Sequence, residues 1–183
     1  MPTENVQILL ITCSCCSVSF ADLIRDDSVL VISNLGNIVP PFLEAAETDV
    51  AASIEYAVTV QSAGRIIVCG HSSCGVLQNL LSPSQDLDVN VNKWLDQAPL
   101  RSRTSEENAD ALRELTEGNV VLQMEHLKTY PEIERKLKDG ELTIDGWLLL
   151  EDCNLIAQYD TKKNSFAVLM SQRIVPFLPT RAN

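Results

Sequence analysis

The sequence predicts a single α/β domain over residues 1–183, with a central, mostly parallel sheet that is flanked by helices and extended by an added edge strand. Three observations lead to this prediction. Several runs of strand length are almost continuously apolar, which is typical of parallel strands covered on both faces. A segment with helical periodicity lies between two of these runs. The chain of 183 residues is also long enough to bury one sizeable core.

The first half of the chain predicts a strand–helix–strand unit. Residues 6–12 form the first apolar run, and residues 29–32 are a second, shorter strand candidate. Residues 49–62 place apolar side chains at helical spacing, with Thr48 as the N-cap. Residues 65–69 form a third buried strand. Because the helix lies between two strands of one sheet, we expect a right-handed parallel crossover.

The second half is expected to be mainly helical and to end in two strands. Residues 82–92, rich in Ser, Pro, Asp and Asn, are typical of a surface loop. Helices are expected at residues 75–81, 91–97, 105–116, 119–129 and 131–138, and late strands at 142–150 and 155–159, the last of them at a sheet edge.

Charge and hydropathy exclude some function classes. The net charge is -11 and the pI is near 4.5, whereas nucleic-acid binding depends on Lys and Arg that neutralise phosphates. We therefore expect no nucleic-acid partner. No apolar stretch is long enough to span a bilayer, and the start lacks the basic region of a signal peptide. We expect a cytoplasmic protein without membrane insertion. Location in a bacterial microcompartment or attachment to a membrane transporter is also compatible with the sequence.

Cysteine and histidine gather in two short segments, each just after a strand candidate. Cys13 follows the first strand, and His71 and Cys74 follow the third. Ligands bind outside the carboxyl ends of parallel strands, so these segments are expected to converge. Two thiolates and one imidazole form a plausible catalytic zinc set, which keeps a fourth position open. A third thiol, Cys15, is a candidate fourth ligand, and whether it closes that position decides between an enzyme and a structural site.

The other cysteines and the second histidine have simpler interpretations. Cys16 is expected to pack against its neighbours, and Cys69, within an apolar strand, is expected to lie in the core. Cys153 has no visible partner. His126 lies among charged residues on a predicted helix, so we expect it to be solvated, and residues 106–110 are expected to form an acidic, solvated face.

In these segments the chain resembles the β-class carbonic anhydrases, most closely their plant and cyanobacterial branch. The matching stretches are residues 13–17, 33–40, 53–58, 69–75, 119–131 and 146–147. The resemblance implies an α/β fold, Zn²⁺ bound by Cys13, His71 and Cys74, and a dimer, because active sites of the family lie at a subunit interface. It also implies reversible hydration of carbon dioxide to bicarbonate by hydroxide from zinc-activated water.

The chain departs from the family pattern around the first ligand. The resemblance implies a catalytic dyad, with an Asp two residues after the zinc Cys and an Arg two residues later, but the chain has Cys15 and Ser17 there. The catalytic residues are therefore left unknown. The N-terminal helices that wrap the partner subunit in the family are expected to be short or absent. The substrate-pocket candidates that the resemblance implies are Leu30, Glu55, Tyr56 and Gly75.

Three functional hypotheses follow. The first is a divergent zinc lyase whose degenerate site makes carbon dioxide hydration weak or absent. The second is a non-catalytic structural, assembly or regulatory relative with a closed Cys₃His site. This relative forms a homo-oligomer of two or more subunits, joins an active relative in a hetero-oligomer, or is a domain of a larger assembly. The third is a redox-responsive zinc protein, in which thiols among Cys13, Cys15 and Cys16 form a disulfide and release the metal.

Overall fold

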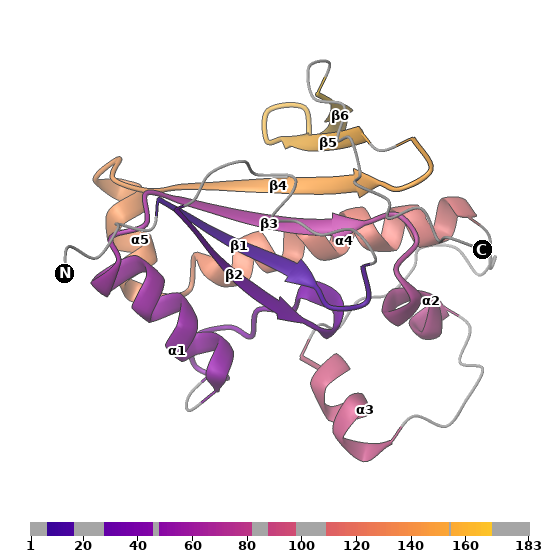
Figure 1. Cartoon of the computed structure of the whole chain (residues 1–183), viewed down its shortest axis with the longest axis horizontal. Helices are drawn as coiled ribbons and strands as arrows, with labels where there is room; N and C mark the ends of the chain where they lie inside the picture. The colour runs from indigo at the N-terminus through magenta and orange to yellow at the C-terminus, as the bar shows by residue number, and fades with distance from the viewer. Residues whose placement is uncertain are drawn as a thin grey trace, which may run out of the picture.

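A computed structural model describes residues 7–16, 28–45, 48–81, 88–97, 109–153 and 155–169. Within them a six-stranded sheet has the order β2-β1-β3-β4-β5-β6 (Figure 1). The strands are β1 (Ile8–Cys13), β2 (Val29–Asn34), β3 (Arg65–His71), β4 (Thr143–Leu150), β5 (Leu155–Asp160) and β6 (Ser165–Val168). The first four are mutually parallel, while β5 and β6 each run antiparallel to the preceding strand. The predicted fold class is confirmed.

Three of the four parallel strands, β1, β2 and β3, extend further toward their carboxyl ends than predicted. The pairing of β1 with β2 continues to Cys13 opposite Asn34, and that of β3 with β4 continues to His71 opposite Leu149. Cys13 and His71 are therefore the last residues of strands, which fixes their backbones by ladder hydrogen bonds. The short strand β6 was not predicted, because only Phe166 of its residues is partly buried and the apolar signal is weak.

The helices are α1 (Asp49–Glu55), α2 (Gly75–Leu81), α3 (Val89–Leu95), α4 (Ala109–Leu127) and α5 (Pro131–Lys138), with a 3-10 turn, η2 (Leu35–Asn37). The N-cap prediction for α1 is confirmed, since Thr48 Oγ1 accepts a hydrogen bond from the Ala51 N–H at 3.2 Å. After Glu55 the chain continues as a π-helical turn, η3 (Tyr56–Val60). The expectation of one regular helix over residues 49–62 is therefore wrong.

The prediction of separate helices over residues 105–116 and 119–129 is also wrong. One helix, α4, passes through Gly118. A glycine inside a helix costs about 1 kcal/mol relative to alanine. Burial of Val120 and Gln123 on the same helix outweighs this local cost. Residues 105–108 lie outside the described residues.

Two smaller expectations need correction. The loop predicted over residues 82–92 is too long, because α3 begins at Val89, while residues 82–87 lie outside the described residues. His126 is partly buried rather than solvated, and its Nδ1–H donates to the Val39 carbonyl oxygen at 2.7 Å. Of the acidic stretch at 106–110, Asp110 is exposed as expected, and residues 106–108 are outside the described residues.

Helix α4 packs directly against β3 and β4, and two glycines permit the close approach (Figure 1). A Cβ on Gly146 of β4 would lie 2.6 Å from Met124 Sδ and 2.9 Å from Val120 Cγ1. A Cβ on Gly70 of β3 would lie 2.8 Å from Val120 Cγ2. The absence of side chains at these two positions therefore sets the distance between helix and sheet.

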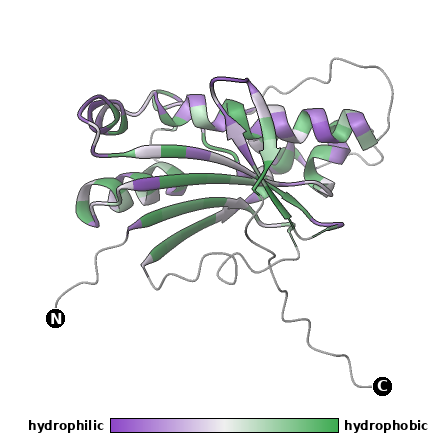
Figure 2. Cartoon of the chain, turned by 90° about the horizontal axis from the view of Figure 1, so that it is seen from above, coloured by the Kyte–Doolittle hydropathy of each residue, from purple (hydrophilic) through white to green (hydrophobic). Residues whose placement is uncertain are grey.

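Both faces of the central strands are buried, which explains their nearly continuous apolar sequence. Leu9 and Ile11 belong to a core shared with α1, α4 and α5, whereas Leu10, Ile67 and Cys69 belong to a second cluster. Figure 2 shows the strands as largely hydrophobic and α4 as alternating between hydrophobic and hydrophilic residues. The predicted core position of Cys69 is confirmed. Among the described helices, none has the length and apolar character needed to cross a membrane.

Candidate metal centre

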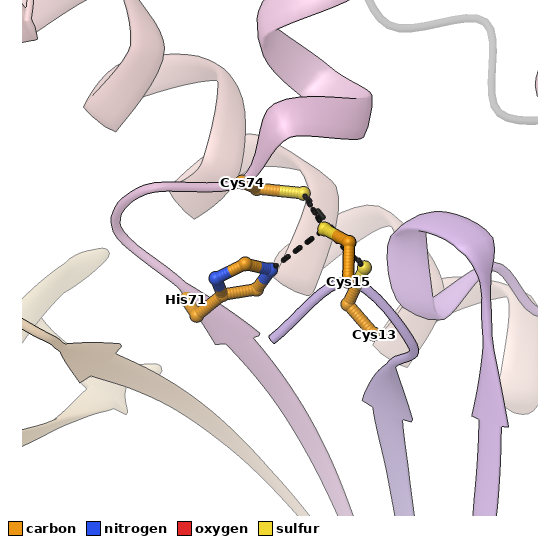
Figure 3. A group of neighbouring side chains, drawn as sticks. All are labelled: Cys13, Cys15, His71 and Cys74. Atoms are coloured by element: carbon orange, nitrogen blue, oxygen red, sulfur yellow. Dashed lines mark hydrogen bonds between the residues drawn. The ribbon is translucent and has the colours of Figure 1, made fainter. Parts of the chain in front are cut away.

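Three side chains of residue types that bind metals meet at the carboxyl edge of the parallel strands. Cys13 ends β1, His71 ends β3, and Cys74 directly precedes α2. Because β1 and β3 are parallel neighbours, their carboxyl ends lie side by side. Figure 3 shows the three side chains directed toward one another, and each is at most 2% exposed. The structure thus brings together residues that are far apart in the sequence.

A fourth donor, Cys15 Sγ, lies in the same cluster. It is 3.3 Å from Cys13 Sγ, 3.3 Å from His71 Nε2 and 3.7 Å from Cys74 Sγ. The chain turns sharply after β1, where the Cys16 N–H donates to the Cys13 carbonyl oxygen at 3.3 Å. This turn carries Cys15 back over the end of its own strand. Cys15 is exposed, in contrast to the three buried donors.

The spacing of the four donors fits one tetrahedral metal ion. With Zn–S bonds near 2.3 Å, a tetrahedral zinc separates its sulfur ligands by about 3.8 Å. The sulfur–sulfur distances are 3.3 Å for Cys13–Cys15, 3.7 Å for Cys15–Cys74 and 3.8 Å for Cys13–Cys74. All four ligand atoms lie within 4.8 Å of one another. A Cys₃His set is typical of closed structural zinc sites, so these residues could hold a metal.

The electrostatics of the cluster favour a cation. A hydrogen bond with Cys74 is the main cause that lowers the pKa of Cys13 to about 3. The same interaction, together with burial, raises the pKa of Cys74 far above its usual range. Burial disfavours an imidazolium, but hydrogen bonds with Cys13, Cys16 and Glu151 outweigh burial and raise the pKa of His71 to about 11. Surroundings that stabilise a buried imidazolium also attract a metal cation.

A glycine N–H supports the Cys13 sulfur. The Gly36 N–H donates to Cys13 Sγ at 3.2 Å, and Gly36 has a φ of +76°, which glycine adopts without steric cost. Two buried amides of α4 hold this loop in place. Asn119 Nδ2 donates to the Gly36 carbonyl oxygen at 2.8 Å, and Gln123 Oε1 accepts from the Val39 N–H at 2.8 Å. The buried polar residues of α4 therefore help to position the thiolate.

Comparison with known proteins connects this geometry to a family. The sequence pattern of the family described as carbonic anhydrase matches residues 8–152. The solved structure of the β-carbonic anhydrase CcaA is similar to this chain, with a TM-score of 0.83 and 30% identity, over 91% of this chain and 85% of that one. The chain belongs to the β-carbonic anhydrase family.

The curated β-carbonic anhydrase relatives are longer than this chain. A carbonic anhydrase of Synechococcus elongatus is 36% identical over 157 residues, which is 79% of this chain and 57% of the relative. One of Synechocystis sp. is 33% identical over 183 residues, which is 92% of this chain and 65% of the relative. The chain therefore spans less than two thirds of either relative. β-Carbonic anhydrases use zinc, and the Cys₃His cluster could bind a metal.

The pocket residues that the β-carbonic anhydrase resemblance implies are dispersed over β2, the end of α1 with the following η3, and the start of α2. Leu30 packs against the main core, and Gly75 opens α2. Tyr56 is 47% exposed, and its hydroxyl oxygen accepts from Gln61 Nε2 at 2.8 Å. Glu55 lines a cavity of about 530 Å³ beside Phe42 and Thr48, which the other three pocket candidates do not line. Ser17 lies outside the described residues.

The sequence pattern did not single out Glu151, which touches the candidate zinc ligand His71. Its Oε2 accepts from His71 Nδ1–H at 3.0 Å. Burial opposes ionisation of this carboxyl, but hydrogen bonds from His71 and the Ser73 N–H lower its pKa overall. A signal was available, because Glu151 directly follows the β4 strand, and ligands of a parallel sheet gather at that edge. Cys16 also contacts Glu151, as part of the packing expected for it, and Cys153 is an exposed free thiol.

Proposed function

We propose that this β-carbonic anhydrase family member holds zinc through Cys13, His71, Cys74 and Cys15, and that hydration of carbon dioxide to bicarbonate is weak or absent in it. The observation that carries this proposal is the position of Cys15 Sγ, which lies between 3.3 and 3.7 Å from the other three donor atoms. With this thiol as the fourth donor, protein ligands complete a tetrahedron.

The residues of the turn account for the expected loss of activity. A zinc ion with an open coordination position supplies the activation of water that hydration needs. Cys15 fills that position with a donor of the protein. It also replaces the Asp that the family resemblance implies, so an oriented hydrogen-bond acceptor is missing. Removing one hydrogen bond that stabilises a transition state costs about 10²–10³-fold in rate.

The exposure of Cys15 favours a second candidate, a slow residual hydration activity. The three buried donors are held by strand ends and the start of α2, whereas Cys15 lies on an exposed turn. A ligand at such a position moves away with less loss of packing than a buried one. In this alternative, carbon dioxide and water reach the site only while Cys15 is displaced.

The experiment that separates these candidates measures zinc content and stopped-flow carbon dioxide hydration on the same sample. We expect one zinc per chain, and X-ray absorption should count three sulfurs and one nitrogen around it. Hydration should be close to the uncatalysed rate. The double variant Cys15→Asp/Ser17→Arg, which restores the family residue types, should raise the hydration rate by about 10²-fold or more.

A matched control is Cys153→Ser, which removes an exposed thiol that is not among the four donors. This variant should keep the sulfur count at three and leave the hydration rate unchanged. Two sulfurs around zinc in the unmodified protein would rule out Cys15 as a ligand. Fast hydration by the unmodified protein would contradict the degenerate-site proposal as a whole.

We also propose that the chain self-associates, with a hetero-oligomer containing an active relative as the alternative. Two β-carbonic anhydrases of Sordaria macrospora, similar in fold at a TM-score of 0.68 and 22% identity, are described as tetrameric. In this chain β2 is an edge strand, and the apolar side chains of Val31, Tyr56 and Val60 are exposed. Light scattering should give a multiple of 20.2 kDa, and a purely monomeric sample would contradict self-association.

A further inference from the structure

We infer that Glu151 is a positioning residue of the zinc site, which fixes the orientation of His71 and joins the two turns that carry the ligands. This inference rests on the proposed zinc site. It concerns a residue beyond the four donors and one that the family pattern did not indicate.

The first argument is the hydrogen bond between Glu151 and His71. Glu151 Oε2 lies 3.0 Å from His71 Nδ1, on the opposite side of the ring from Nε2, which faces Cys15 Sγ at 3.3 Å. An ionised carboxylate can only accept, so the proton of the neutral imidazole is held on Nδ1. Nε2 then keeps its lone pair toward the metal site. A carboxylate behind a ligating histidine fixes its tautomer and ring orientation in this way.

The second argument is that Glu151 also holds the backbone of the loop after His71. The same Oε2 accepts from the Ser73 N–H at 3.0 Å. The Glu151 N–H donates to Ser72 Oγ at 3.1 Å, and the Ser72 N–H donates to the Leu149 carbonyl oxygen at 2.9 Å. With the His71 bond included, four hydrogen bonds thus join the end of β4 to residues 71–73, and two of them end on one carboxylate oxygen.

The third argument is the contact with the other turn. The Cys16 thiol donates to Glu151 Oε1 at 3.9 Å, a long contact of the kind that sulfur makes. Cys16 directly follows Cys15 in the turn after β1. The two oxygens of one carboxylate therefore touch both ligand-bearing turns. The Glu151 side chain is 17% exposed, so these contacts are only partly open to competition from water.

The test compares Glu151→Ala with a matched variant, Asp152→Asn. Asp152 is the adjacent, exposed carboxylate, so its removal controls for the general loss of negative charge near the site. Competition with a chromogenic chelator measures the dissociation constant of zinc alone. Loss of a carboxylate partner of a metal-ligating histidine weakens metal binding by about 10–100-fold. We expect that loss for Glu151→Ala and a change of less than about 2-fold for Asp152→Asn.

A second readout reports on the imidazole itself. The chain has two histidines, so ¹⁵N-histidine NMR of the zinc-loaded protein resolves His71, with His126 as an internal reference. The Nδ1–H proton of His71 should exchange slowly with water in the unmodified protein and rapidly in Glu151→Ala. A role in loop folding alone would leave this signal unchanged, provided that zinc stays bound.

The outcomes are distinguishable. If the unmodified protein binds no zinc, the proposed function fails. If it binds zinc and Glu151→Ala matches Asp152→Asn in both readouts, the positioning role is overturned. If Glu151→Ala does not fold, Glu151→Leu takes its place, because it keeps a similar side-chain volume and removes both acceptor oxygens. An unchanged dissociation constant and an unchanged Nδ1–H signal in Glu151→Leu would then overturn the inference.

Discussion

Two neighbouring regions of β3 depend on opposite properties of their residues. Gly70 lies where α4 contacts the strands β3 and β4. We call this contact region the α4 seam and define it by Gly70, Gly146, Val120 and Met124. His71, the next residue, belongs to the donor cluster. The seam depends on missing atoms, since a Cβ on either glycine would lie within 2.9 Å of a side chain of α4. The cluster depends on donor atoms that all lie within 4.8 Å of one another, four pairs of them at 3.3 to 3.8 Å.

This difference separates the packing that holds the fold together from the side chains that set the chemistry of the candidate site. The seam sets how the helix lies on the sheet, and its residues are buried, so a change there lowers the stability of the fold. The donor cluster lies at the ends of the strands, where the turn after β1 accepts a different side chain without moving the sheet. Under the proposed function Cys15 is such a change, because it stands where the family resemblance implies an Asp, while β1 and β3 keep their pairing.

The largest expected effect is a loss of zinc from the donor cluster that leaves the α4 seam and the fold intact. Cys74→Ser removes a candidate ligand at the start of α2. Replacing a residue that only supports a ligand weakens metal binding by about 10–100-fold, so loss of a thiolate should cost more than that. Zinc content after dialysis should fall to near zero. The circular dichroism spectrum should stay that of a folded α/β protein, since the sheet and the α4 seam do not include this side chain.

The matched control is Cys69→Ser, which replaces another buried cysteine, on β3. Its burial among apolar side chains raises the pKa of this thiol far above the usual range, and it is not among the four donors. The variant should keep its zinc, while a hydroxyl in this apolar cluster lowers stability by about 1–3 kcal/mol. Zinc loss in Cys69→Ser, or retention of zinc in Cys74→Ser, would contradict the assignment of donors.

The sequence predicted the parallel strands because burial on both faces leaves a continuous apolar run. It also predicted that Cys13 and His71 meet, because ligands gather at the carboxyl ends of parallel strands. It did not decide the role of Cys15, whose reach depends on the hydrogen bond that closes the turn after β1. It missed Glu151, because that contact depends on the register that places His71 opposite Leu149. The sequence could place Glu151 at the carboxyl end of a strand, but the contacts of Cys15 and Glu151 depend on the three-dimensional structure.

The continuous helix α4 was mispredicted for a related reason. Gly118 locally favours a helix end, and the packing that overrides this preference comes from residues distant in sequence. Asn119 Nδ2 donates to the Gly36 carbonyl oxygen, and Gln123 Oε1 accepts from the Val39 N–H. These hydrogen bonds stabilise a helix that continues past Gly118. They also connect α4 to the loop that supports Cys13.

The smaller expected effect tests the α4 seam without touching any donor. Gly146→Ala places a Cβ 2.9 Å from Val120 Cγ1, a branched side chain that is fully buried. Met124 Sδ, at 2.6 Å, is the end of a flexible side chain and can move aside. Overpacking of this kind costs about 1–3 kcal/mol, so the melting temperature should fall by several degrees.

The matched control is Gly118→Ala, on the exposed side of α4, where no atom lies within 4 Å of the added Cβ. This variant should instead stabilise the protein by up to about 1 kcal/mol. Both variants should retain zinc, and equal melting temperatures for the two would show that the close approach of α4 does not depend on the glycine at position 146.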